Sequence, residues 1–152
     1  MSDRDTLSRR RLRTWLRLLR LTRSTENQLR EFLRVEFDTT LPRFDVAAAL
    51  FRSGRPIRMS ELSQMLLVSN GNATAVVERL EKDGLAARVT GEDDRRVVLV
   101  ALTEAGRSWF ETLAKAHEEK VNQLFDRLGH RELDTIRDLV RHLEGKTDDR
   151  IH

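Results

Sequence analysis

The sequence predicts a mainly helical chain with one small β-hairpin, organised as a single domain over residues 1–152. Apolar residues recur at three- and four-residue steps in several segments, as amphipathic helices require. One valine-rich segment near the middle has turn residues at its centre and indicates a hairpin. Charged residues make up 35% of the chain against 39% hydrophobic residues. Because charge is so abundant, the apolar residues must gather on one face of each helix.

The composition excludes several classes of protein. The chain has no cysteine, so it has no disulfides, thiolate metal sites or cysteine redox sensors. Arginines interrupt every run of leucines in the first 24 residues, MSDRDTLSRRRLRTWLRLLRLTRS. This segment is therefore neither a secretory signal nor a membrane span. We expect a soluble, cytoplasmic protein without membrane contact.

The net charge of +3 conceals an asymmetry between the two parts of the chain. Residues 1–58 carry 14 basic and 7 acidic side chains, an excess of +7. Residues 59–152 carry 14 basic and 18 acidic side chains, an excess of −4. A basic first part fits an acidic partner such as DNA. It equally fits pairing with the acidic second part, within one subunit or between two.

Long amphipathic helices are predicted at both ends of the chain. The apolar stripe of the first runs from Leu12 to Phe37, and about thirty residues span roughly 45 Å, more than a small domain needs. Thr103 is expected to cap a helix that Gly129 interrupts before a last one. We assign residues 7–37 and 103–145 as dimerisation helices, because a symmetric homodimer would cover their apolar faces.

The central segment, residues 40–102, predicts two short helices followed by a hairpin. Ser60 is expected to cap the first short helix, and residues 68–70 form a tight turn. The second helix ends at Gly84, which makes a helix-turn-helix unit. Strands are expected at residues 85–90 and 96–102, with TGEDDR between them. A helix-turn-helix followed by a hairpin is the winged helix-turn-helix arrangement.

The start of the second short helix is polar and uncharged, with Ser69, Asn70, Asn72 and Thr74 exposed if Ala73, Val76, Val77 and Leu80 face the core. Asparagine can donate to and accept from an adenine edge, and threonine offers a hydroxyl and a methyl group. The helix N-terminus adds a positive end that favours phosphate. The pattern therefore suits base reading, although asparagines there can also serve only as helix caps.

The hairpin tip carries Arg95 and Arg96 directly after Asp93 and Asp94. An arginine at such a tip can enter the minor groove of DNA, where negative potential is concentrated. Asp94 can hold Arg96 in one rotamer through a charge-assisted hydrogen bond. The alternative is an ordinary surface ion pair, worth about 0 to 1 kcal/mol.

The ordered combination of these features resembles the MarR family of winged-helix regulators. GEDDRRVVLVALTEAG is similar to the family signature of Asp-x-Arg, five residues and Leu-Thr-x-x-Gly, which falls on Asp94, Arg96, Leu102, Thr103 and Gly106. MSELSQMLLVSNGNATAVVERLEKDGL is similar to the family's helix-turn-helix. The resemblance covers about residues 40–110, and the flanking helices agree in number and length.

The resemblance implies a triangular homodimer whose two winged-helix lobes bind a pseudo-palindromic site on double-stranded DNA. It further implies a ligand-responsive repressor of transcription. The family's recognition positions fall on Asn70, Asn72 and Thr74, and its wing arginine falls on Arg96. Many members have arginine where this chain has Ala75, which puts the operator sequence in doubt.

The resemblance also implies an effector pocket between the dimer helices and the winged helix. The SNGN phrase resembles a branch that often regulates degradation of aromatic acids, so an aromatic or phenolic effector is expected. Flat apolar walls and one cation would suit such a ligand, and the candidates are Trp15, Arg43, Phe44 and His117. Alternatively, Trp15 and Phe44 are plain core residues.

Other functions have weaker support. The chain has no tyrosine or cysteine, and its four histidines lack metal-ligand spacing, so we expect no enzyme, metal or cofactor. Residues 56–83 carry three basic and four acidic side chains. This near-neutral balance leaves open a protein-interaction module, such as an adaptor or anti-repressor, and a metal-dependent regulator is a third class.

Overall fold

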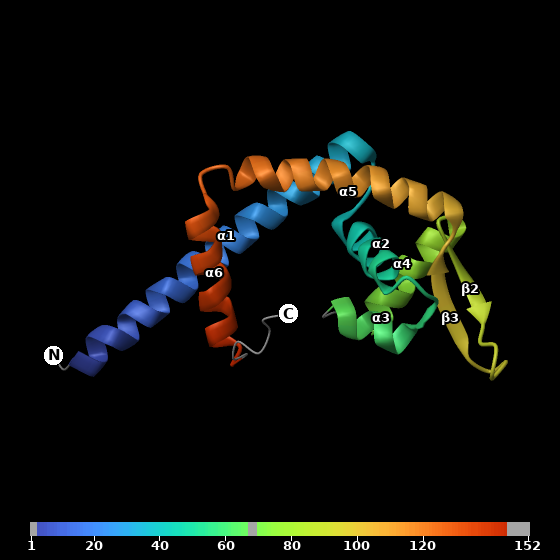
Figure 1. Ribbon diagram of the computed structural model, residues 1–152, viewed down its shortest axis with the longest axis horizontal. Helices are drawn as coiled ribbons and strands as arrows, with labels where there is room; N and C mark the ends of the chain where they lie inside the picture. The colour runs from blue at the N-terminus through green and yellow to red at the C-terminus, as the bar shows by residue number, and fades with distance from the viewer. Residues whose placement is uncertain (1–2, 67–69, 146–152) are drawn as a thin grey trace. The chain divides into compact units, whose positions relative to one another are not determined.

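The computed structural model describes residues 3–66 and 70–145, with side chains described for residues 6–66 and 72–145. These residues form six helices and one three-stranded antiparallel sheet (Figure 1), which confirms the predicted mainly helical fold with a hairpin wing. The elements are α1 (Asp3–Phe37), α2 (Leu41–Ser53), β1 (Ile57–Arg58), α3 (Met59–Leu66), α4 (Asn70–Lys82), β2 (Ala86–Thr90), β3 (Val98–Leu102), α5 (Glu104–Leu124) and α6 (His130–Leu143). The chain divides into two compact units, residues 1–118 and 119–152.

The first unit has one hydrophobic core, to which eight elements contribute. Its largest fully buried side chains are Leu33, Val46, Ile57, Leu62, Val77, Leu80, Val100 and Leu113. Burying such a side chain stabilises the folded state by about 1.5 to 3 kcal/mol. The core therefore joins the end of α1 and the start of α5 to the lobe formed by α2–β3.

The helix α2 has a capping residue at each end. Thr40 Oγ1 accepts a hydrogen bond from the Arg43 backbone N–H at 3.3 Å, and Pro42 lies in the first turn. Gly54 ends the helix with a φ of 65°, a left-handed conformation that glycine adopts without strain. The prediction that Ser60 caps α3 was wrong. The helix begins at Met59, directly after β1, so Ser60 lies inside its first turn and does not precede it.

The sheet has the strand order β1–β3–β2. In the hairpin Ala86 lies opposite Leu102 and Thr90 opposite Val98, so both strands are shorter than predicted. β1 adds a pairing of Ile57 with Val100, which buries Ile57 completely. The sequence did not predict this strand, because two residues are too few to show an alternating pattern.

The Leu-Thr-x-x-Gly pattern forms the joint between α4 and α5. Thr103 Oγ1 donates to the Gly84 carbonyl at 2.6 Å and accepts from the Gly106 N–H at 3.0 Å. The Thr103 N–H donates to the Leu85 carbonyl at 3.1 Å. A Cβ atom on residue 106 would lie 1.9 Å from the same carbonyl oxygen, so Gly106 permits this close approach. The joint fixes the hairpin against both helices.

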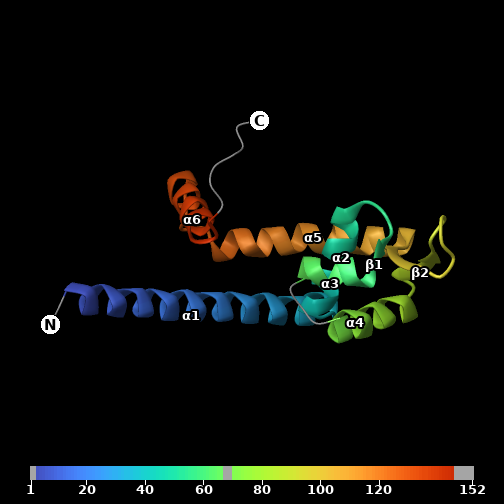
Figure 2. The same ribbon diagram turned by 90° about the horizontal axis from the view of Figure 1, so that it is seen from below.

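Most of α1 extends beyond the core as a straight helix (Figure 2). Leu29 and Leu33 are buried near its end. Closer to its start six large apolar side chains are exposed, namely Leu7, Leu12, Trp15, Leu16, Leu18 and Leu21. A group of exposed apolar side chains of this kind marks a surface that another protein surface covers.

The second unit contains the end of α5 and the helix α6. The Gly129 N–H donates to Glu132 Oε2 at 3.0 Å at the start of α6. The predicted apolar face is present and exposed on Leu133, Ile136, Leu139, Val140 and Leu143. No described residue of α6 is buried.

Candidate nucleic-acid interface

The helix α4 packs one side on the core and exposes the start of the other. Ala73, Val77 and Leu80 are buried, as predicted, whereas Val76 is half-buried. Asn72 is exposed and Thr74 is half-buried. Ser69 and the side chain of Asn70 lie outside the described residues. Base reading by this set therefore stays a prediction.

The charges on α4 are balanced and largely engaged in ion pairs. Arg88 on β2 contacts Glu81 at 2.8 Å and Glu78 at 3.9 Å. Arg79 lies 3.9 Å from Asp83. These contacts join α4 to β2, and they leave the helix without a net positive charge toward a partner.

The tip of the wing is a tight turn whose two central residues are Arg95 and Arg96. The Val97 N–H donates to the Asp94 carbonyl at 3.1 Å, and the Gly91 N–H donates to the Val97 carbonyl at 2.8 Å. This hydrogen-bond pattern places both arginines at the outermost point of the hairpin.

Asp94 accepts three hydrogen bonds from Arg96. Its Oδ1 accepts from the Arg96 backbone N–H at 3.0 Å and from Nε at 3.2 Å, and its Oδ2 accepts from Nη2 at 3.3 Å. The Arg96 side chain is nevertheless 92% exposed. Hydrogen bonds from Arg96, together with the charge of Arg58, hold the pKa of Asp94 below its ordinary value. The carboxylate thus stays ionised and pre-orients an arginine that points into solvent.

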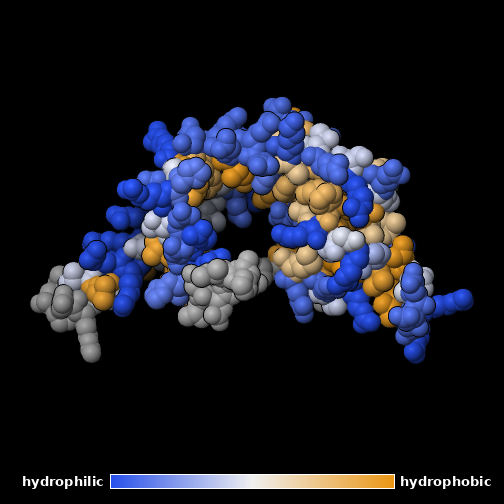
Figure 3. Space-filling view, in the orientation of Figure 1, coloured by the Kyte–Doolittle hydropathy of each residue, from blue (hydrophilic) through white to orange (hydrophobic). Residues whose placement is uncertain are grey.

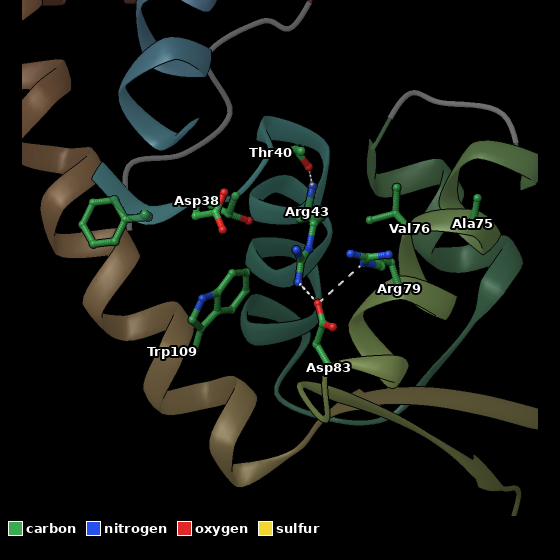
Figure 4. A pocket seen from close by; sticks show the side chains of 10 residues that line it. Asp38, Thr40, Arg43, Ala75, Val76, Arg79, Asp83 and Trp109 are labelled. Atoms are coloured by element: carbon green, nitrogen blue, oxygen red, sulfur yellow. Dashed lines mark hydrogen bonds and ion pairs between the residues drawn. The ribbon is translucent and has the colours of Figure 1, made fainter. Parts of the chain in front are cut away.

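A cavity of about 800 Å³ lies beside α4, within the first unit (Figure 4). It is lined by Phe37, Asp38, Thr39, Thr40, Arg43, Ala75, Val76, Arg79, Asp83 and Trp109. Arg43 Nη2 donates to Asp83 Oδ2 at 2.5 Å, and the Arg43 guanidinium carbon lies 5.9 Å from the centre of the Trp109 ring. The Arg43–Asp83 pair therefore links α2 to the C-terminal end of α4 across the cavity.

Two polar groups of this cavity have no hydrogen-bond partner among the described residues. They are Arg43 Nε and Thr39 Oγ1, and both atoms are buried. The Arg43 side chain is only 16% exposed. Because buried polar groups are normally hydrogen-bonded, the cavity suits a ligand that brings acceptor oxygens.

The cavity differs from the effector pocket that the sequence predicted. Of the four candidates, Arg43 alone is among its lining residues. Trp15 is 56% exposed on α1, and the rings of Phe44 and His117 stack on each other at 4.3 Å. The aromatic wall is Trp109, which in the sequence belongs to the apolar stripe of α5 and could not be distinguished from a core residue. Ala75 also faces this cavity.

The described part of the chain lacks two kinds of feature. No group of three or more histidine, aspartate or glutamate side chains there is placed to hold a metal ion. No helix in these ranges has the length and apolar character needed to cross a membrane.

Comparison with known proteins places this arrangement in one family. The sequence model of the MarR family matches residues 40–98. An HTH-type transcriptional regulator of Bacillus cereus is 34% identical over 97 residues, which are 64% of this chain and 63% of that protein. The regulator PecS of Dickeya dadantii is 30% identical over 103 residues, 66% of this chain and 62% of PecS. Residues 40–98 of this chain, which include most of the winged-helix lobe, belong to the MarR family.

Solved MarR structures share the whole fold. A MarR family regulator from Silicibacter pomeroyi is 29% identical with a TM-score of 0.79, and the alignment covers 97% of this chain and 100% of that one. Escherichia coli MarR in complex with operator DNA is 27% identical with a TM-score of 0.73, covering 84% and 91%. By sequence, the chain spans 63% of the length of the Bacillus cereus regulator and 62% of the length of PecS.

Proposed function

We propose that this protein is a sequence-specific, double-stranded DNA-binding regulator of transcription that acts as a homodimer, most simply as a repressor. The wing carries this proposal, because Arg96 is oriented by Asp94 and yet exposed. An arginine held in one rotamer loses less conformational entropy when it enters a groove. The relatives support the same function, since they are named transcriptional regulators and one was crystallised with operator DNA.

In this proposal, two parts of the lobe divide the recognition of DNA. The start of α4 enters the major groove and reads bases through Asn72 and Thr74, together with Ser69 and Asn70. The wing places Arg96, and beside it Arg95, in the adjacent minor groove. The neutral surface of α4 suits this role, because hydrogen bonds to base edges specify sequence, whereas charge mainly adds affinity.

The homodimer is proposed because both terminal regions expose apolar faces. The exposed fraction is 56% for Leu12 and Trp15 on α1, and 58% for Leu139 on α6. A second copy would bury both faces in a two-fold symmetric interface. Two lobes would then meet half-sites about 34 to 36 Å apart on a pseudo-palindromic operator.

The substitution Arg96→Ala tests the proposal. We expect weaker binding to a duplex that the protein selects from a randomised library, because each copy loses one phosphate or groove contact. The slope of log affinity against log salt should become shallower by about 1.8 for a dimer, or 0.9 per lost contact. Arg127→Ala is the matched control, because it removes the same charge from an exposed position outside the lobe. Equal affinity and salt slope for both variants would contradict the assignment of the wing.

A ligand-responsive function is the second proposal, and the cavity at Arg43 carries it. An aromatic or phenolic acid would place its ring against Trp109 and its carboxylate on Arg43, in competition with Asp83. Breaking the Arg43–Asp83 pair would detach α2 from the end of α4 and shift the population of lobe positions. DNA affinity would fall because the two lobes would no longer match their half-sites.

Benzoate and 4-hydroxybenzoate serve as probes for this second proposal. We expect them to quench tryptophan fluorescence and release DNA from the wild-type protein, but not from an Arg43→Met variant. Arg52→Met is the matched control, because Arg52 belongs to the same helix and is exposed. If the probes acted equally on Arg43→Met and the control, the cavity would not be their site.

A further inference from the structure

The start of α1 contains the strongest concentration of positive charge in the chain. Residues 6–25 have seven arginines and no acidic residue, an excess of +7. Since the net charge of the whole chain is +3, the remaining residues together carry −4. Arg10, Arg13, Arg17 and Arg20 are exposed, and no ion pair joins them to another described residue. Figure 3 shows hydrophilic residues along the outer edge of α1.

These four arginines form one face of the helix, which we call the basic face. At about 100° per residue they fall within an arc of roughly 80°. Leu12, Trp15 and Leu19 lie on the opposite side, along the same line as the buried Leu29 and Leu33. The apolar side of α1 is therefore directed to protein, and the basic face is directed away from it.

The basic face is electrostatically unfavourable in an isolated chain. Arg13 and Arg17 are four residues apart, and Arg10 and Arg13 are three apart, so like charges repel along the helix. Cations near the start of a helix also oppose its macrodipole. An anionic partner with high charge density would reverse both effects.

A second copy of this chain does not supply such a partner. Residues 26–40 carry two basic and four acidic side chains, and residues 104–152 carry nine basic and eleven acidic ones. The central residues 41–103 carry nine basic and eight acidic side chains. No segment balances an excess of +7, so charge complementarity points to a polyanion outside the protein.

We propose that the basic face of α1 binds the phosphate backbone of DNA beside the bases contacted by the lobe, an inference that rests on the proposed DNA-binding function. DNA carries one negative charge per about 1.7 Å, and residues 10–20 span about 15 Å of helix. Arginine also matches phosphate in a bidentate geometry. The basic face supplies the charge that α4 lacks.

The length of α1 fits this placement. Residues 3–28 extend about 39 Å beyond the packed end of the helix, close to the 34 to 36 Å between half-sites one helical turn apart. In Figure 1 the amino end of α1 and the tip of the wing lie at opposite ends of the first unit, and both lie at its lower side. An acidic membrane is disfavoured as the partner. Leu12 and Leu19, which a membrane would have to bury, lie on the same side of α1 as Leu29 and Leu33, which pack on the core.

The test compares two double variants of α1 on a library-selected duplex with long flanks. Arg13→Gln with Arg17→Gln removes two charges from the basic face. Arg30→Gln with Arg34→Gln removes the same charge at the same spacing from the other end of the helix, where Arg34 pairs with Glu31 at 2.6 Å. For a dimer, the basic-face variant should make the salt slope shallower by about 3.6, four contacts at about 0.9 each, and should reduce the affinity gained from the flanks. The control variant should keep both.

Three results would overturn the inference, and they separate it from the proposed function. If both double variants lowered the slope equally or not at all, while Arg96→Ala still weakened binding, the basic face would be wrong and the lobe assignment would stand. If wild-type protein bound no duplex, the proposed function would fail together with this inference. If the basic-face variant lost binding to phosphatidylserine vesicles but kept its DNA slope, the partner would be lipid. Circular dichroism and sedimentation would verify that each variant folds and assembles as wild type does.

Discussion

The lobe and the helix α1 use charge in opposite ways. In the lobe, Arg43, Arg88 and Arg96 each contact a carboxylate of the same chain. In α1, the four arginines of the basic face contact no described carboxylate, and residues 6–25 contain no acid. The element that would read bases is nearly neutral, whereas the main source of positive charge lies elsewhere. Sequence specificity and electrostatic attraction are thus assigned to different elements.

The two regions also differ in how they use apolar residues. Leu62 and Leu80 of the lobe are completely buried, as is Leu33 where the end of α1 packs on the lobe. Leu12 and Leu16, at the start of α1, are 56% and 49% exposed. The lobe can therefore fold around its own core, whereas the start of α1 is expected to find its apolar partner in a second subunit.

Alanine substitutions should distinguish the buried leucines from the exposed leucines of α1. The substitution of a buried leucine should cause the largest loss of stability. Leu33→Ala should lower the free energy of unfolding by about 2 to 5 kcal/mol, because it leaves a cavity in the core. Leu12→Ala should leave the helix content of the chain unchanged and raise the dissociation constant of the dimer. Chemical denaturation and sedimentation equilibrium measure the two quantities. Equal losses of folding stability in a dilute monomer would contradict the distinction.

The joint between α4 and α5 should be nearly as sensitive. Gly106→Ala should lower the free energy of unfolding by about 1 to 3 kcal/mol, because the added Cβ overlaps the Leu85 carbonyl. Gly129→Ala is a useful comparison, since a Cβ there would meet only the Glu132 side chain, at 3.1 Å. Thermal unfolding of both variants measures the difference, and a smaller loss at position 106 than at 129 would refute the role of the joint.

The smallest effect concerns pH. Burial lowers the pKa of His117, whose ring stacks on Phe44. The unfolded state therefore binds a proton more readily than the folded state, so the contribution of His117 to stability is complete above its ordinary pKa of 6.5 and is lost as pH falls below it. His117→Gln should show a weaker decline in unfolding temperature between neutral and acidic pH than wild type does. His130→Gln, which changes an exposed histidine at the start of α6, is the control for the substitution itself.

The sequence was sufficient to predict those features that have a strong local signal. The hairpin, the cap at Thr103 and the apolar stripe of α6 follow from residue types at fixed spacing. The pairing of Asp94 with Arg96 was also predicted, because the two residues are adjacent to a tight turn. The MarR resemblance rested on the same residues.

The cavity could not be predicted in the same way. Arg43 and Asp83 are 40 residues apart, and their contact depends on how α2 packs against α4. Trp109 reads as a core residue because helical periodicity does not reveal which apolar side chains border a cavity. The two-residue strand β1 escaped prediction because its only signal is its partner strand, β3.

In the proposed function, the protein reads DNA sequence as a symmetric pair of lobes. Selection of duplexes from a randomised library by the wild-type protein tests this symmetry. We predict a two-fold symmetric consensus whose half-sites are separated by about one helical turn, 34 to 36 Å. Enrichment of no sequence, or of a single half-site without symmetry, would contradict it.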